Sequence, residues 1–209
     1  MDKLVLTADQ IYALAYIMKA EYLDFYYITA STRDDNTNWL FDVTNQLVSL
    51  EILDEDFSGN TTIKPEVEEL VKPLYFGKKE SSLDIDIFGE KESNNAYRFH
   101  FLDDKITMAK KVNNGYEFSE VKTDDIRNLV SSILPKDYEA ESKKAYIKYD
   151  ENVVSRVFVA KNTELDVKNL IATFVETDGV VYEENESNEI FSLSGEDFNE
   201  KLYSIMAEV

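Results

Sequence analysis

The sequence predicts an α+β fold in which an antiparallel β-sheet, arranged as a meander, is flanked by helical bundles. Two observations predict this fold class. In the first 75 residues, apolar side chains recur at the i, i+3, i+4 and i+7 positions that lie on one face of a helix. Between residues 83 and 121, apolar and polar side chains alternate, as in strands with one buried face. Such a sheet is exposed to solvent on one face and covered by helices on the other.

Three helices are expected in the N-terminal part, over residues 8–28, over residues 37–50 and from Pro65 to Pro73. Thr7 is a suitable N-cap for the first helix, and Pro65 suits the first position of the third. Residues 54–60 end in Ser-Gly-Asn, which indicates a turn between the second and third helices.

The first helix has two stripes of apolar and tyrosine side chains instead of one. Ile11, Leu14 and Met18 form the stripe that we assign to the core. Tyr12 and Tyr16 belong to the second stripe, for which two assignments stay open. They pack against the second helix or the sheet, or they form part of a docking surface, because tyrosine suits a half-wet interface.

Four strands of the meander are expected over residues 83–87, 97–101, 105–110 and 116–121. The turns between the later strands contain Asp-Asp and Asn-Asn-Gly, which favour tight hairpins. A capped helix over residues 123–135 and a charged junction over residues 136–144 follow. The remaining expected elements are a strand over 145–149, an apolar run over 153–160 that fits strand or helix, a helix over about 164–176, a hairpin of 180–182 with 189–193, and a final helix capped by Ser194.

A pattern in the two strand-to-helix junctions bears on domain organisation. Residues 118–133 resemble residues 191–205 once a one-residue gap is allowed. The pattern either marks two similar halves, about 1–135 and 136–209, or reflects what any strand followed by a capped helix looks like. We therefore expect a single compact domain over 1–209, with the internal two-fold similarity left open.

The charge of the chain is strongly negative. Its 42 acidic and 22 basic residues give a formal net charge of -20. This field repels phosphate backbones and anionic lipid, so we expect neither nucleic-acid binding nor membrane insertion. The chain has no cysteine, no basic secretory n-region and no apolar stretch of about 20 residues, and these features favour the cytoplasm.

The sequence contains no catalytic or metal-binding signature, so an enzyme is not expected. His100 is the single histidine, lies mid-strand and is expected to be a surface or internally satisfied residue. The acidic segment before Asn60 loosely resembles a calcium loop but lacks the bidentate acid at its twelfth place, and no glycine pattern fits a phosphate loop. No catalytic residue, metal ligand or cofactor is predicted.

The N-terminal stretch LVLTADQIYAL, with the pattern Leu6-Thr7-x-x-x-Ile11-x-x-Leu14, begins a tyrosine-rich helix that precedes further helices and a meander. In this arrangement the chain resembles the EspG-type chaperones of type VII secretion systems, and most of all the shorter Gram-positive branch that includes EsaE. The resemblance implies a cytosolic chaperone that captures the helical targeting region of a secreted substrate, such as a toxin. It also implies that the chaperone keeps this substrate soluble and presents it to the secretion ATPase.

The resemblance also points to partner-binding residues, because loops of the sheet and the C-terminal helical region hold the substrate in that family. Here these regions are the longest meander turn and the last helix, and the predicted residues are Glu90, Lys91, Asn94, Asn95, Phe198, Leu202 and Tyr203, with Tyr12 and Tyr16 as the docking alternative above. A small acidic protein also fits a different class. It could be an immunity protein whose carboxylates cover the basic active site of a toxin nuclease.

Overall fold

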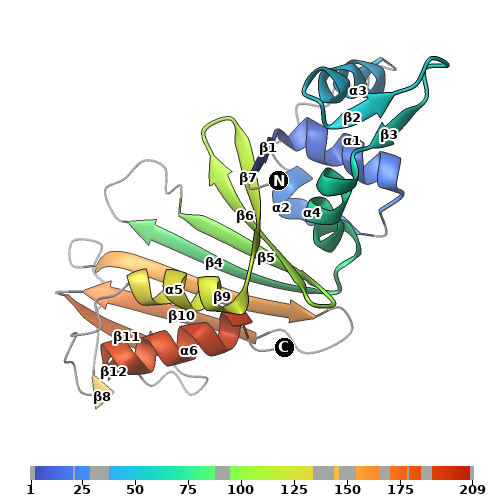
Figure 1. The fold of residues 1–209 in the computed structure, drawn as a ribbon. Helices are drawn as coiled ribbons and strands as arrows, with labels where there is room; N and C mark the ends of the chain where they lie inside the picture. The colour runs from blue at the N-terminus through green and yellow to red at the C-terminus, as the bar shows by residue number, and fades with distance from the viewer. Residues whose placement is uncertain are drawn as a thin grey trace. The chain divides into compact units, whose positions relative to one another are not determined.

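A computed structural model describes residues 3–20, 22–28, 38–87, 95–133, 144–145, 154–164, 170–177, 179–184 and 190–207 (Figure 1). It confirms the predicted α+β class. The helices are α1 (Ala8–Met18), α2 (Phe25–Ile28), α3 (Trp39–Ser49), α4 (Pro65–Phe76), α5 (Thr123–Ile133) and α6 (Gly195–Ala207). The strands are β1 (Leu4–Leu6), β2 (Leu53–Glu55), β3 (Thr61–Ile63), β4 (Lys79–Ile87), β5 (Ala96–Leu102), β6 (Lys105–Val112), β7 (Gly115–Val121), β8 (Lys144–Ala145), β9 (Val154–Glu164), β10 (Leu170–Thr177), β11 (Val180–Glu184) and β12 (Ile190–Leu193).

The strands form a 10-stranded sheet in the order β1-β7-β6-β5-β4-β9-β10-β11-β12-β8, and β2 and β3 pair separately. The four predicted strands of the meander are confirmed as β4 to β7. The chain divides into two compact units. Unit 1 contains Met1–Lys78 and His100–Glu120, and unit 2 contains Lys79–Phe99 and Val121–Val209. The division into similar halves near residue 135 stays a prediction.

The core of unit 1 is formed by α1, α2, α3 and α4 with strands β1, β2, β6 and β7. Tyr75 of α4 is fully buried and donates its hydroxyl to the carbonyl of Ile11 at 2.8 Å. Thr107 of β6 donates to the carbonyl of Leu70 at 2.6 Å, which fixes α4 on the sheet. Buried hydroxyls that find a backbone acceptor in this way hold a helix in one position.

The helix that we predicted to end at Pro73 continues to Phe76. Pro73 lacks an N–H, but its carbonyl accepts a hydrogen bond from the Gly77 N–H at 3.0 Å. Leu74 and Tyr75, which follow it, are both buried. Packing of these two side chains therefore offsets the local cost of proline within the helix.

The predicted helix over residues 8–28 is wrong in its length, because α1 ends at Met18. Lys19 adopts a left-handed conformation (φ 54°), and the Ala20 N–H closes the helix on the Ala15 carbonyl at 2.9 Å. A separate short helix, α2, follows, and the Asp24 carboxylate accepts from the Tyr26 N–H at 2.9 Å. At the other end, the predicted N-cap is confirmed, since Thr7 accepts from the Gln10 N–H at 3.3 Å.

The turn between α1 and α2 places Tyr27 in the interior of unit 1. Its ring lies 4.9 Å from that of Tyr116, and its hydroxyl lies 2.8 Å from His100 Nε2. Both Tyr27 and His100 are buried. The histidine is therefore an internally satisfied residue, as the sequence analysis expected.

Unit 2 has α5 and α6 packed on a sheet whose longest hairpin is β9–β10. Here the predicted helix over 164–176 is wrong, because Leu170–Thr177 is a strand that pairs with β9 along its length. Four β-branched side chains, Ile171, Thr173, Val175 and Thr177, favour the extended conformation. Of the run over 153–160, left open between strand and helix, the described residues 154–160 are part of strand β9.

The remaining C-terminal predictions agree with the described residues. Strands β11 and β12 pair antiparallel as the predicted hairpin, and α6 is the predicted final helix. Of the strand predicted over 145–149, only residue 145 lies in the described part, in β8. None of the described helices is long and apolar enough to cross a membrane.

Candidate functional site

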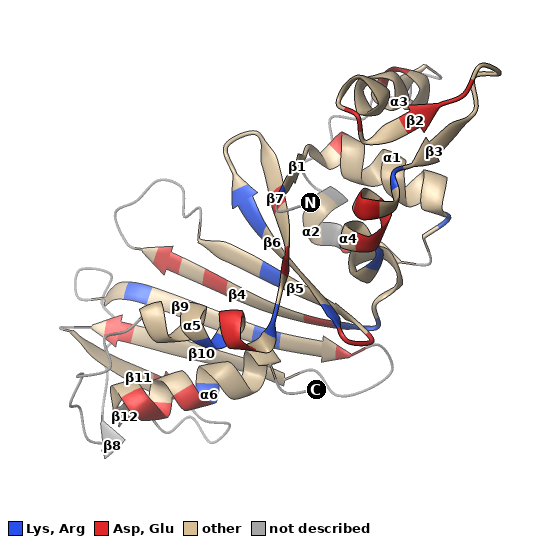
Figure 2. Cartoon of the chain, viewed as in Figure 1, with Lys and Arg blue, Asp and Glu red and all other residues tan. Residues whose placement is uncertain are grey.

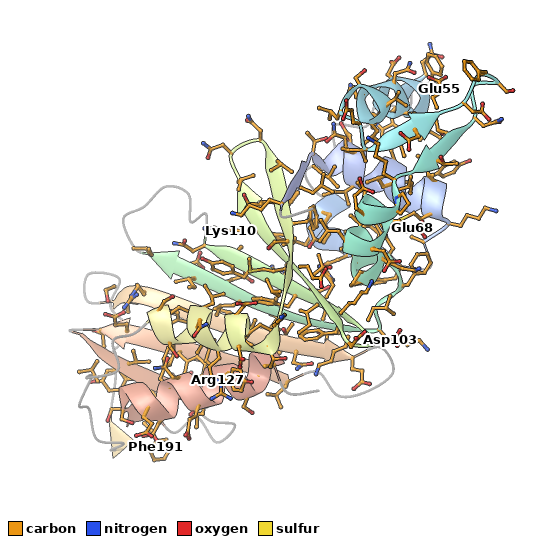
Figure 3. The ribbon with its side chains drawn as sticks, viewed as in Figure 1. Glu55, Glu68, Asp103, Lys110, Arg127 and Phe191 are labelled. Atoms are coloured by element: carbon orange, nitrogen blue, oxygen red, sulfur yellow. The ribbon has the colours of Figure 1, made fainter. Side chains whose placement is uncertain are left out.

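A groove between α5 and α6 is the candidate site in unit 2. It encloses about 440 Å³ and is lined by Arg127, Val130 and Ser131 of α5 and by Glu196, Asn199, Glu200 and Tyr203 of α6. We call it the α5–α6 groove. Figure 3 labels Arg127 on α5. Within each helix the lining residues follow the i, i+3, i+4 spacing, so each helix gives one face to the groove.

The opposite face of α6 holds the helix on the sheet. Phe198 is fully buried, and its ring lies 5.3 Å from that of Phe158 in β9 and 5.1 Å from that of Phe174 in β10. Near the C-terminus of α6, Ser81 donates to the Met206 carbonyl at 2.7 Å and Asn162 donates to the Ile205 carbonyl at 2.8 Å. These bonds satisfy carbonyls that a helix end leaves without intrahelical partners. The groove wall formed by α6 is therefore fixed at several points.

The first turn of α6 is also fixed. Ser194 accepts from the Asp197 N–H at 3.1 Å and donates to the Asp197 carboxylate at 2.7 Å, so it caps the helix as predicted. In α5, the Lys122 N–H donates to the Asp125 carboxylate at 2.8 Å. At the other end of α5, the Arg156 guanidinium donates to the Ile133 carbonyl at 3.3 Å. Both helices thus have ordered ends.

The groove combines aromatic, charged and amide groups. The guanidinium carbon of Arg127 lies 4.1 Å from the centroid of the Tyr203 ring, a cation–π contact across the groove. Glu196 and Glu200 add two carboxylates from α6, a helix on which Figure 2 shows several acidic segments in red. The Asn199 side-chain oxygen is buried, and no residue in the described part of the chain donates a hydrogen bond to it. Because Asn199 also lines the groove, this acceptor lies next to the space that a ligand with a donor would occupy.

The predicted partner-binding residues have different locations. Glu90, Lys91 and Asn94 lie outside the described residues. Asn95 directly precedes β5, and its carbonyl accepts from the Ile85 N–H at 3.1 Å. Phe198, Leu202 and Tyr203 are on α6, where Tyr203 lines the groove, and Tyr12 and Tyr16 are on α1.

Phe198 and Leu202 lie in the core of unit 2, and their side chains are fully buried. In this conformation they support the groove wall and do not reach a partner. The sequence analysis did not identify Arg127, Ser131 or Asn199. The sequence feature that could have identified them is an i, i+3, i+4 spacing of side chains outside the core. This spacing occurs in both helices, and each helix follows a similar strand.

The two tyrosines of α1 differ in their surroundings. The Tyr12 ring packs edge-on against Trp39 of α3, with 5.4 Å between the ring centroids, which agrees with packing against the second predicted helix. Tyr16 is 66% exposed. Of these two tyrosines, Tyr16 is therefore the one that presents most of its surface to solvent.

Within the described residues, no group of three or more His, Asp or Glu side chains is placed to hold a metal ion. No family model matches this sequence, and no curated protein does. Among solved structures, the fold is similar to that of the Mycobacterium tuberculosis type VII secretion system chaperone EspG5, in the structure of its complex with the PE25–PPE41 dimer. The TM-score is 0.64 with 8% sequence identity, over 97% of this chain and 95% of that chain. The chain therefore has an EspG-like fold.

Proposed function

We propose that this protein is a chaperone that binds the helical targeting region of a type VII secreted substrate in the α5–α6 groove. The observation behind this proposal is a groove between two fixed helices, with a buried acceptor in its wall, on an EspG-like fold. In the similar structure, EspG5 is bound to a PE25–PPE41 dimer. For this chain we propose a partner of the same class, namely a secreted protein that the chaperone binds before export.

The groove has the physical properties that a helical ligand requires. Two helices side by side form a channel that accepts the side-chain ridge of a third helix. The half-buried Tyr203 provides apolar contact, and Asn199 Oδ1 accepts a hydrogen bond from a polar side chain of the ligand. Glu196 and Glu200 favour a ligand helix with lysine or arginine beside its apolar face.

In this proposal the protein acts in the cytoplasm by binding and release, and no covalent bond is made or broken. It shields the apolar face of the substrate helix, keeps the substrate soluble and presents it to the secretion ATPase. The net charge of -20 adds repulsion between loaded complexes, which counters their association. Membership of the EsaE-type branch and a toxin as the substrate are parts of the same proposal, as is contact through the turn containing Glu90, Lys91, Asn94 and Asn95.

The test uses a candidate toxin that co-purifies with the protein, divided into its N-terminal helical part and its catalytic part. We expect the helical part to be retained by the immobilised full-length protein and toxin activity to be unchanged. Tyr203→Ser is expected to weaken retention, whereas Tyr182→Ser, a half-buried tyrosine of the same unit outside the groove, leaves it unchanged.

Retention of the catalytic part alone, with loss of toxin activity, would overturn the proposal. That result would favour the immunity protein, the other class that the acidic composition fits. If the wild type and Tyr203→Ser retained the helical part equally, the α5–α6 groove would not be the site that binds it.

A further inference from the structure

The tip of the β2–β3 hairpin in unit 1 presents a phenylalanine that folding leaves in solvent. Phe57 has an exposed fraction of 113%, at least that of a residue in an extended chain. No other large apolar side chain in the described residues is as exposed; Phe41 of α3 follows at 68%. An exposed phenylalanine adds nothing to the core, and an aromatic side chain buries a large area when a partner covers it.

The loop that holds Phe57 is rigidly organised by Asp56. The Asp56 carboxylate accepts from the backbone N–H of Ser58 at 2.8 Å and of Asn60 at 2.9 Å. It also accepts from the Asn60 side-chain amide at 2.9 Å, and the Asp56 N–H donates to the Asn60 carbonyl at 2.9 Å. Gly59 adopts the left-handed conformation (φ 80°) that closes the turn. The backbone that carries Phe57 is therefore held in one conformation before any partner arrives.

The base of the hairpin is fixed to the core of unit 1. Ile52 and Leu53 are buried, and Ile63 packs against the same core. The Ile52 N–H donates to the Leu47 carbonyl of α3 at 2.9 Å, and the Lys64 N–H donates to the Ile52 carbonyl at 3.1 Å. A preorganised loop on a fixed base loses little conformational entropy on binding, which favours affinity.

The charges around Phe57 are almost all negative, as Figure 2 shows along β2. Residues 51–64 contain four acids (Glu51, Asp54, Glu55 and Asp56) and one base (Lys64), a net charge of -3. The Lys64 ammonium lies 3.8 Å from Glu51 and 3.9 Å from Asp54, at the base of the hairpin. Glu55 and Asp56 flank the tip, and Figure 3 labels Glu55 there. The tip is thus an aromatic side chain bordered by carboxylates.

We propose that the β2–β3 tip is a second interaction surface, at which Phe57 inserts into an apolar pocket of a folded protein whose rim carries lysine or arginine. The carboxylates select this partner, because they repel anionic lipid and nucleic acid. They also disfavour a second copy of this chain, whose net charge is -20. The surface lies in unit 1, and the α5–α6 groove lies in unit 2. The protein can therefore hold a substrate in one unit and engage a basic partner with the other.

The test places the photo-crosslinker p-benzoylphenylalanine at position 57 of the full-length protein. Irradiation is performed in an extract of the producing cells, with the same crosslinker at position 41 as the matched control. We expect a crosslink specific to position 57, and sequencing of the crosslinked peptide is expected to show apolar residues beside lysine or arginine. With the identified partner purified, Phe57→Ser and Glu55→Lys are each expected to weaken its affinity by about tenfold or more, and Phe41→Ser by less than about twofold.

The substitutions leave the fold intact because the Phe57 and Glu55 side chains are exposed, and thermal unfolding of each variant checks this. Absence of a crosslink specific to position 57 would overturn the proposal. So would a crosslinked peptide without basic residues, or an affinity that Glu55→Lys leaves unchanged. The Phe57→Ser variant is also tested for retention of the secreted substrate, which we expect to be unchanged because Phe57 lies outside the α5–α6 groove. Failure of the proposed tip interaction can therefore be distinguished from failure of the proposed groove.

Discussion

The Arg127 guanidinium carbon lies 4.1 Å from the centroid of the Tyr203 ring, which joins the two helices that line the α5–α6 groove. An exposed cation–π contact of this kind contributes about 0.5–1 kcal/mol. Its main effect here is to orient the tyrosine ring. The groove is thus organised by one arginine from α5 and one aromatic ring from α6.

Arg127→Gln removes the cation and retains a polar side chain of moderate length. We expect the free energy of unfolding to fall by no more than about 1 kcal/mol. Substrate binding is expected to weaken further, because the Tyr203 ring loses its fixed orientation. Isothermal titration calorimetry with denaturant unfolding separates the two effects. Arg127→Lys keeps the charge and should recover part of the affinity; no recovery would mean that charge is not what orients the ring.

Phe198 and Tyr203 both lie on α6, but we expect Phe198 to stabilise the fold and Tyr203 to bind the substrate. Phe198→Ala removes a ring packed between Phe158 and Phe174, and we expect a loss of about 3–5 kcal/mol in the free energy of unfolding. Tyr203→Ser, at a half-buried position, should cost less than half as much. Urea titration measures both. Equal losses would show that Tyr203 is a core residue.

Tyr12 and Tyr16 test the two assignments of the second stripe of α1. Tyr12→Ser removes the edge contact with Trp39 and is expected to cost about 1 kcal/mol or more of stability. Tyr16→Ser should change stability by no more than about 0.5 kcal/mol, because its side chain is mostly exposed. If Tyr16 belongs to a docking surface, its variant binds the partner more weakly at unchanged thermal stability. Unchanged binding would leave Tyr16 as an ordinary surface residue.

The order of the β2–β3 tip is expected to depend on pH through Asp56. Hydrogen bonds from the Asn60 side chain, and then from the backbone N–H groups of Asn60 and Ser58, lower the pKa of the Asp56 carboxyl from its ordinary value of 3.8. Because the folded-state pKa is below the unfolded value, the stabilisation is complete above about pH 4 and is lost as the pH falls through the folded-state pKa.

Carboxyl chemical shifts of Asp56 and amide exchange at Ser58 and Asn60 measure this transition. Asn60→Ala removes the largest contribution, so the pKa of Asp56 should rise toward 3.8 and amide protection should fall. If the carboxyl group of Asp56 in the wild type titrated with a midpoint at or above pH 3.8, the result would contradict the hydrogen-bonded loop.

Much of the fold is predictable from local pattern. Alternation and turn residues locate β4 to β7, and Ser194 marks the start of α6. The errors occur where local pattern is ambiguous. Leu170, Ile171, Phe174 and Val175 are spaced as on a helical face, but Leu170–Thr177 is a strand that pairs with β9 on one side and β11 on the other. The end of α1 has no glycine or proline, since Lys19 itself adopts the left-handed conformation.

The candidate site was harder to predict than the fold. Tyr203 was identified through the last helix, but the groove also requires α5, and nothing in a single sequence states that α5 and α6 lie side by side. Phe198 and Leu202 were predicted to contact a partner, yet both side chains are buried, and the Phe198 ring packs on Phe158 and Phe174 of the sheet. The spacing identified the apolar residues of α6 but did not say which of its faces the sheet would cover.

The central claim, that the α5–α6 groove holds a helical segment of a secreted protein, is tested most directly by the affinity of Asn199→Leu for the N-terminal helical part of the co-purified substrate. Asn199→Leu removes the buried acceptor of the groove wall and keeps the side-chain size. We predict binding weakened by about tenfold or more at unchanged thermal stability, with Tyr182→Ser binding as the wild type does. Wild-type affinity in Asn199→Leu, together with retention of the catalytic part alone, would contradict the claim.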